Sequence, residues 1–124
     1  MVQRFDYLVI GSGIAGMSFA LKVADKGSVA LICKTALQEA NTYYAQGGVA
    51  SVTNPIDDFE KHIQDTLIAG DGHCDRAAVE KVVKEAPAQI NELIEWGVKF
   101  DKTAEGDFDL HREGGHSEFR ILHH

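Results

Sequence analysis

Residues 5 to 16 read FDYLVIGSGIAG, and this stretch decides the fold of the chain. Phe5 to Ile10 form a short run of aromatic and β-branched residues, which is typical of a buried strand. The glycines then end the strand, and Met17 to Lys26 predict a helix with Gly27 as its C-terminal cap. A second apolar run, Ser28 to Cys33, predicts another buried strand. This order of elements indicates a βαβ unit with parallel strands and a right-handed crossover.

The spacing of Gly11, Gly13 and Gly16 follows the dinucleotide-binding fingerprint G-x-G-x-x-G. Gly11 permits a tight turn, Gly13 lets the backbone approach a pyrophosphate, and Gly16 lets the helix pack closely on the strand. The pyrophosphate would lie at the helix N-terminus, where unpaired N–H groups and the positive end of the helix dipole favour an anion. Because the pattern lies between a strand and a helix, we favour a nucleotide site over a glycine turn without a ligand.

The residue after the second strand leaves the kind of dinucleotide open. The general fingerprint places an acidic residue there, which binds the ribose hydroxyls, but this chain has Lys34. A lysine side chain cannot accept a hydrogen bond, so a NAD site of the usual kind is disfavoured. Lys34 is either a solvated surface residue or a contact on the adenosine side of the nucleotide.

Beyond the βαβ unit, the sequence predicts an irregular stretch and then helices. Apolar residues at helical spacing after residues 36–54 predict an amphipathic helix that ends near Ala69. Asp75 is a good N-cap for the next helix, and Pro87 predicts a kink or a break with a new helix that ends at Gly97. Short strands are expected at residues 98–100 and 109–111.

Composition and charge place the chain among globular proteins. Of its 124 residues, 44% are hydrophobic and 25% are charged, and its net charge is −7. The acidic balance, without a basic stripe, disfavours nucleic acid as a partner. No apolar run reaches the roughly 20 residues that span a bilayer, and no signal-peptide pattern precedes the first strand. We therefore expect a cytoplasmic protein without a membrane partner. The cysteine and histidine spacings match no metal site, so no metal is expected.

Four motifs, in chain order, resemble the flavoprotein family of succinate dehydrogenase, fumarate reductase and L-aspartate oxidase. They are YLVIGSGIAG at 7–16, NTYYAQGGVA at 41–50, DTLIAG at 65–70 and REGGHS at 112–117. The resemblance covers nearly the whole chain. It implies an α/β fold, the N-terminal part of a Rossmann-like FAD-binding domain, with a βαβ unit followed by helices and an incomplete sheet. Residues 1–124 would form a partial FAD-binding domain, truncated before the capping and C-terminal helical domains.

The resemblance implies FAD as the cofactor. In the family the glycine turn binds the pyrophosphate, the Ala-Gln-Gly-Gly loop runs along the isoalloxazine ring, and Lys34 fits the aspartate oxidase branch. Many succinate dehydrogenases and membrane-complex fumarate reductases carry a histidine, bonded covalently to FAD, at the position of Asn41, so a non-covalent flavin is expected here. The expected cofactor-binding residues are Gly11, Ser12, Gly13, Ile14, Ala15, Gly16, Lys34, Asn41, Thr42, Tyr43, Tyr44, Ala45, Gln46, Gly47 and Gly48.

Glu113 is the residue that the resemblance assigns to the substrate. Succinate-handling relatives typically have an aromatic residue before the paired glycines, whereas Arg112-Glu113-Gly114-Gly115 is similar to the aspartate oxidase branch. L-Aspartate is succinate with an α-ammonium group, and a carboxylate supplies the opposite charge. The implied reaction is the FAD-dependent oxidation of L-aspartate to iminoaspartate, with fumarate or oxygen reoxidising the flavin.

The resemblance also implies a place in bacterial de novo NAD biosynthesis, where quinolinate synthase acts next. Family members are several times longer, and their carboxylate-binding and proton-moving arginines would lie beyond His124. No catalytic residue is therefore expected within the chain, and the fragment alone is expected to be inactive. Two alternatives stay open: a fumarate reductase or succinate dehydrogenase flavoprotein and, in another class, a non-catalytic nucleotide-binding module.

Overall fold

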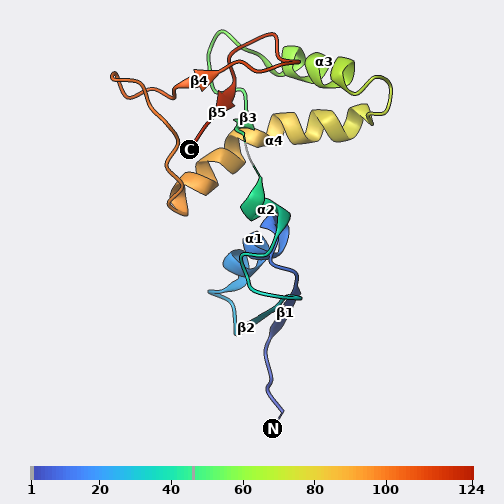
Figure 1. The fold of residues 1–124 in the computed structure, drawn as a ribbon, viewed down its shortest axis with the longest axis vertical. Coiled ribbons are helices and arrows are strands. Elements are labelled where there is room, and N and C mark those ends of the chain that lie inside the picture. The colour runs from blue at the N-terminus through green and yellow to red at the C-terminus, as the bar shows by residue number, and fades with distance from the viewer. Residues whose placement is uncertain (1, 46) are drawn as a thin grey trace. The chain divides into compact units, whose positions relative to one another are not determined.

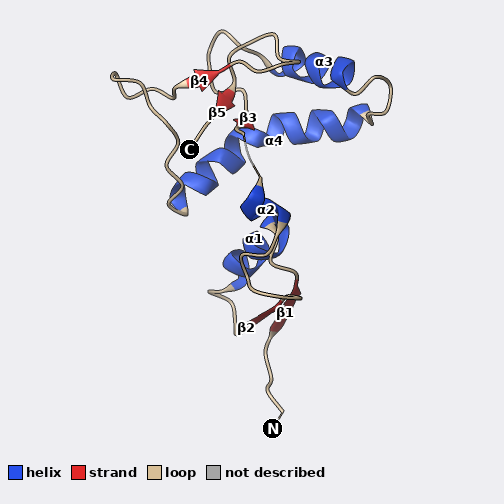
Figure 2. Ribbon diagram, in the orientation of Figure 1, coloured by secondary structure: helices blue, strands red, loops and turns tan. Residues whose placement is uncertain are grey.

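The computed structural model of the chain describes residues 2–45 and 47–124. The chain divides into two compact units, Met1–Gln46 and Gly47–His124. The first contains a parallel pair of strands and two helices, and the second contains a three-stranded antiparallel sheet and two helices (Figures 1 and 2). Among the described residues, none of the helices combines the length and the hydropathy that a bilayer span requires.

The first unit contains the predicted βαβ arrangement. Strand β1 (Tyr7–Ile10) pairs in parallel with β2 (Val29–Ile32), and helix α1 (Ile14–Val23) lies between them in the chain. Tyr7 lies opposite Val29, and Ile10 lies opposite Ile32. The prediction of two parallel strands joined through the glycine turn is therefore confirmed, and each strand lies inside its predicted range. The prediction that both strands are buried is wrong for this chain, because Val9 is the only buried residue of β1 and β2.

Helix α1 begins one turn earlier than the predicted start at Met17. Gly13 is its N-cap, with an extended backbone, and the N–H of Met17 donates to the carbonyl oxygen of Gly13 at 3.0 Å. Gly16 therefore lies inside the helix, at its third residue, and not in the turn. The predicted start is wrong because Ile14, Ala15 and Gly16, which the prediction left in the glycine turn, already form the first turn of α1.

Close packing of α1 on β1 depends on this glycine. A Cβ on Gly16 would collide with the carbonyl oxygen of Gly11 and would lie 3.3 Å from Cγ1 of Val9. Val9 and Val23, which is the last residue of α1, are both buried. The predicted cap at Gly27 is wrong, because α1 has already ended at Val23.

The stretch at 36–54 contains two short elements. Asn41–Tyr44 form the single turn α2, which belongs to the first unit. Val49–Ala50 form the strand β3, which belongs to the second unit. Both elements are too short to produce a periodic pattern of apolar residues, so the sequence did not predict them.

Helices α3 (Phe59–Ala69) and α4 (Arg76–Glu95) of the second unit pack against each other. Both begin at an aspartate N-cap, Asp58 for α3 and Asp75 for α4. Each carboxylate accepts a hydrogen bond from the N–H three residues later, at 2.8 and 3.1 Å respectively. The predicted end of α3 at Ala69 and the predicted N-cap at Asp75 are confirmed.

Pro87 lies inside α4, so the prediction of a new helix there is wrong. Proline lacks the N–H that would bond to the carbonyl of Val83, and a kink is the usual result. Figure 1 shows α4 bending part-way along its length. Val83 and Ile90, on either side of the proline, are both buried. Burial of two such side chains contributes on the order of 3–6 kcal/mol, which offsets the roughly 3 kcal/mol that a proline costs inside a helix.

The C-terminus of α4 is a Schellman motif around Gly97, whose φ of +103° lies in the left-handed region. The N–H of Gly97 donates to the carbonyl of Ile94 at 2.9 Å, and the N–H of Val98 donates to that of Leu93 at 3.0 Å. The predicted helix end at Gly97 is confirmed. The strand predicted at 98–100 is wrong, because the N–H of Val98 closes the helix.

The sheet of the second unit has the strand order β3-β5-β4, with both neighbours antiparallel to the central strand. β4 (Leu110–His111) lies within the strand predicted at 109–111, which is confirmed in part. β5 (Ile121–Leu122) was not predicted, because two apolar residues between polar ones are too short a signal. Both residues of β5 are buried, and they form the centre of the sheet.

The second unit also contains a buried arginine with two carboxylate partners. The exposed fraction of Arg120 is 0%, and its Nε and Nη2 donate to the two carboxylate oxygens of Asp57, each at 2.8 Å. Its Nη1 donates to Asp65 of α3 at 2.5 Å, and Asp65 also accepts from the N–H and the hydroxyl of Ser117 at 2.8 Å. Burial by itself would lower the pKa of Arg120, but the hydrogen bonds that it donates to the two aspartates outweigh burial and raise that pKa.

Replacing Asp57 with asparagine should destabilise the 124-residue chain strongly. The substitution Asp57→Asn removes one of the two charges that compensate the buried guanidinium, and breaking such a pair costs about 3 kcal/mol or more. Urea denaturation measures the loss in the free energy of unfolding. Glu118→Gln is the matched control, because it removes the partly exposed ion pair with Lys61 (2.8 Å), which contributes less than about 1 kcal/mol. Equal, small losses in the two variants would show that the buried pair does not stabilise the fold.

Candidate functional site

The carboxyl ends of β1 and β2 lie at the same edge of the parallel strand pair. Gly11 follows β1 directly, and its N–H donates to the carbonyl oxygen of Ile32 in β2 at 2.8 Å. Lys34 follows β2 and is exposed. Ligands of open α/β sheets bind at this edge. The structure thus places Lys34 and the glycine turn, both predicted to bind the cofactor, at the edge where a dinucleotide is expected.

The glycine turn leaves the N-terminus of α1 open. Gly11 has a φ of +103°, in the region that favours glycine, and a Cβ on it would meet no atom within 4 Å. Gly13, the N-cap of α1, provides no side-chain hydrogen bond to the helix. A Cβ on Gly13 would approach only the hydroxyl of Thr42, at 3.9 Å. Among the described residues of this unit, none crowds Gly13, so an anion has room beside this glycine at the helix N-terminus.

Helix α2 lies beside this turn. The N–H of Ile14, the first residue of α1, donates to the hydroxyl oxygen of Thr42 at 3.1 Å. The structure therefore brings together two segments that are far apart in the sequence, the turn at 11–16 and the single turn at 41–44. Ser12 and Ala15, which are also expected at the cofactor, lie in the first of these segments.

The other residues predicted at the cofactor lie on the surface of the first unit. The exposed rings of Tyr43 and Tyr44 pack edge to face with centroids 5.4 Å apart. The hydroxyl of Tyr44 donates to Glu39 at 2.7 Å, which raises the pKa of Tyr44. Asn41 and Ala45, at the two ends of α2, are exposed as well. Gln46, also predicted to bind the cofactor, lies outside the described residues.

Gly47, Gly48 and Glu113 belong to the second unit, where Gly48 and Glu113 approach the same side chain. A Cβ on Gly48 would collide with the side chain of Ile121 and would lie 3.1 Å from Nε2 of His123. The carboxylate of Glu113, whose exposed fraction is 51%, lies with Oε1 3.2 Å from the same nitrogen. His123 thus connects the loop predicted at the flavin with the residue predicted at the substrate. Sequence reasoning missed His123, because its position depends on the unpredicted strand β5.

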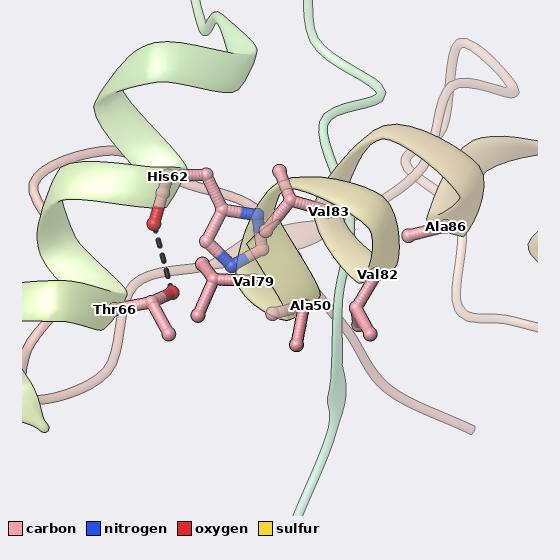
Figure 3. A pocket seen from close by; sticks show the side chains of 8 residues that line it. Ala50, His62, Thr66, Val79, Val82, Val83 and Ala86 are labelled. Carbon is pink, nitrogen blue, oxygen red and sulfur yellow. Dashed lines mark hydrogen bonds between the residues drawn. The ribbon is translucent and has the colours of Figure 1, made fainter. Parts of the chain in front are cut away.

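A separate hollow of about 390 Å³ lies between α3 and α4. Figure 3 shows the imidazole of His62 pointing from α3 toward Val79 and Val83 of α4. The hydroxyl of Thr66 donates to the carbonyl oxygen of His62 at 2.8 Å. Burial, and next the charge of Arg120, lower the pKa of His62, so the ring is neutral at pH 7. None of the predicted site residues is among the described residues that line this apolar hollow.

Residues 6–124 match the sequence model of a family that is described as an FAD-binding domain. The chain belongs to this family. A protein of Nicotiana tabacum named L-aspartate oxidase 2-b, chloroplastic, is 52% identical over 99% of this chain and 19% of its own length. The L-aspartate oxidase of Vibrio cholerae is 50% identical over 98% of this chain and 24% of its own length.

Solved structures show the same fold. An E. coli quinol fumarate reductase superposes with a TM-score of 0.85 at 30% identity, over 95% of this chain and 21% of the reductase chain. The α/β fold, an N-terminal part of an FAD-binding domain with incomplete sheets, is therefore as predicted. The chain spans 19 and 24% of the length of the two curated relatives above.

FAD is the cofactor that this family indicates, and the first unit fits its pyrophosphate. Gly13 leaves room for a phosphate in front of α1, while Lys34 lies at the same edge of the strand pair. The hydroxyl of Thr42 occupies only the N–H of Ile14 and leaves the approach past Gly13 open. The glycine turn and the helix N-terminus behind it are the features that a dinucleotide pyrophosphate requires at the start of a Rossmann-like unit.

Alanine substitutions at Gly13 and Gly16 should separate cofactor binding from folding. Gly13→Ala adds a methyl group that the chain accommodates but that blocks the phosphate. FAD affinity should therefore fall at least tenfold, while the free energy of unfolding should change by less than about 0.5 kcal/mol. Gly16→Ala forces the methyl group against backbone and should cost about 1–3 kcal/mol of stability as well. Flavin fluorescence titration of the full-length protein measures affinity, and urea denaturation measures stability. Unchanged FAD affinity in Gly13→Ala would contradict this site.

Proposed function

We propose that the chain is the N-terminal part of an FAD-dependent L-aspartate oxidase, which converts L-aspartate to iminoaspartate. The observation that carries the proposal is the position of Glu113. Its half-exposed carboxylate lies beside the same imidazole as Gly48, which belongs to the loop expected along the flavin. Relatives named L-aspartate oxidase at 50 and 52% identity over nearly the whole chain support this choice of substrate.

The substrate differs from succinate by one α-ammonium group, and Glu113 would bind that group. A carboxylate beside an ammonium forms a charge-assisted hydrogen bond, which is roughly twice as strong as a neutral one. The bound FAD would supply the acceptor for the hydride of the α-carbon. The protein would hold the pyrophosphate at α1 and orient the substrate by its charge.

The groups that bind the two carboxylates of aspartate would come from the rest of the full-length protein. The arginines of the second unit are all engaged: Arg120 with two aspartates, Arg76 with Glu60, and Arg112 over the ring of Phe119. We therefore propose that residues 1–124 form a partial FAD-binding domain, that the capping and helical domains lie elsewhere in the polypeptide, and that the isolated chain is inactive.

Two electron acceptors, fumarate and oxygen, would reoxidise the flavin. Iminoaspartate would then be the substrate of quinolinate synthase, which links the proposed reaction to NAD biosynthesis. The alternative is a fumarate reductase or succinate dehydrogenase flavoprotein, which the shared fold allows. Glu113 and Asn41 both favour the aspartate oxidase, because the alternatives typically carry an aromatic residue and a histidine at these positions.

FAD should be bound without a covalent link. Asn41 begins α2 at the position where covalent relatives have a histidine, and an asparagine amide does not form that bond. Denaturation of the full-length protein in acid, followed by removal of the precipitate, should leave all of the yellow flavin in solution. Flavin that stays on the polypeptide would contradict a non-covalent site.

The substitution Glu113→Gln in the full-length enzyme should separate the two proposed activities. It keeps the shape of the side chain and removes the charge opposite the ammonium, so kcat/KM for aspartate should fall by about 10- to 100-fold, or roughly 1.5–3 kcal/mol. Fumarate reduction should fall much less, because fumarate has no ammonium group.

Glu118→Gln is the matched control, since Glu118 lies in the same loop but pairs with Lys61. Steady-state kinetics of both reactions provide the test. Equal losses of both activities in Glu113→Gln, or no loss in either, would remove Glu113 from substrate recognition. A wild-type holoenzyme that aspartate cannot reduce would refute the proposed function as a whole.

A further inference from the structure

His123 borders both segments that the proposed function assigns to the flavin and the substrate. It directly follows β5, whose Leu122 pairs with β3 on one side and with β4 on the other. Gly48 precedes β3, and Glu113 comes shortly after β4. The central strand β5 therefore places His123 between the segment that contains Gly48 and the segment that contains Glu113.

The imidazole of His123 contacts both segments through one atom. Nε2 lies 3.2 Å from Oε1 of Glu113, close enough for an ion pair but without the alignment of a hydrogen bond. The same nitrogen would lie 3.1 Å from a Cβ on Gly48. A side chain at position 48 would therefore push the imidazole of His123 away from Glu113. Glycine at this position allows the imidazole to stay next to the carboxylate of Glu113.

The surroundings of His123 hold its ring in place. The ring packs edge to face against the ring of His111, with centroids 4.7 Å apart, and the His123 carbonyl oxygen accepts from the N–H of Asp101 at 2.9 Å. The exposed fraction of the side chain is 30%, yet Nε2 itself is buried and has no hydrogen-bond partner among the described residues. Buried polar atoms in proteins are nearly always paired. The carboxylate of Glu113, 3.2 Å away, is a group that can pair with this nitrogen.

We propose that His123 is a positioning residue, which donates a hydrogen bond from Nε2 to Glu113 and thereby aims its carboxylate at the α-ammonium of the substrate. This inference rests on the proposed function. A glutamate side chain rotates about three bonds, and a half-exposed one samples many rotamers. A donor fixed by β5 selects the rotamer that faces the Gly48 segment. His123 thereby favours dicarboxylates that carry an ammonium group over those that do not.

The preference for dicarboxylates with an ammonium group can be measured at equilibrium by titrating two ligands into the full-length, FAD-loaded protein. α-Methyl-L-aspartate carries the ammonium group but has no α-hydrogen, so it binds without being oxidised. Succinate is the matched dicarboxylate without an ammonium group. Titration of the flavin absorbance should show that His123→Leu weakens binding of α-methyl-L-aspartate about tenfold and binding of succinate less than twofold. His123→Gln, which keeps a donor, should recover most of the affinity.

Two further variants test whether His123 acts on ligand binding through Glu113. In the Glu113→Gln background, His123→Leu should weaken α-methyl-L-aspartate binding by no more than a further twofold, because the carboxylate that it positions is gone. His124→Leu is the matched control, because the Nδ1 of His124 lies 2.7 Å from the carbonyl oxygen of Lys99, a residue outside both loops. This variant should bind both ligands like the wild type.

Several outcomes would overturn the role of His123. Equal weakening for both ligands would indicate a general structural role, and additive losses in the double variant would show that His123 acts independently of Glu113. Loss of FAD from His123→Leu would instead indicate direct contact with the cofactor. Each of these results leaves the proposed function intact if wild-type enzyme oxidises aspartate, whereas wild-type enzyme that does not oxidise aspartate refutes the proposed function.

Discussion

The second unit depends on one guanidinium group, that of Arg120. Its side chain joins Asp57, ahead of α3, to Asp65 within α3, while its backbone belongs to the sheet. The carbonyl oxygen of Arg120 accepts from Ser51, and its N–H donates to His111. One residue therefore connects the sheet to the helical layer through hydrogen bonds of both its backbone and its side chain. β5 and His123 follow directly in the chain, so this connection lies next to the residues that approach Glu113.

In the first unit the corresponding constraint is steric and not electrostatic. Strand β1 and helix α1 approach so closely that no atom can be added at Gly16. α1 begins three residues after Gly11, so its first N–H groups lie next to the carboxyl end of β1. A Cβ on Gly13, by contrast, would meet only the hydroxyl of Thr42, at 3.9 Å. Packing and ligand access are thus set by different glycines of one motif.

The parts of the fold that follow from local chemistry could be predicted from the sequence. The aspartate cap of α4 and the glycine end at Gly97 depend on interactions between residues close in the chain. The parallel strands pair across a crossover, but the glycine motif between a strand and a helix indicates that arrangement. The prediction of a new helix at Pro87 failed because burial of Val83 and Ile90, a tertiary effect, outweighs the tendency of proline to break a helix. Strand β5 carries no periodic signal, so neither the ion pairs of Arg120 nor the approach of His123 to Glu113 could be foreseen. The residues expected at the cofactor were identified by motif, whereas the geometry that joins Gly48 to Glu113 required the structure.

The short strand β5 also imposes a rule of spacing on this region. Side chains alternate between the two faces of a strand, so Arg120 and Leu122 lie on one face and Ile121 and His123 on the other. Insertion or deletion of a single residue between Arg120 and His123 would shift the register and turn the imidazole away from Glu113. The loop from Glu113 to Ser117 is under no such parity constraint, because its residues are not paired in the sheet. The four-residue segment from Arg120 to His123 therefore does not tolerate a change in length, whereas pairing in the sheet places no such limit on the loop before it.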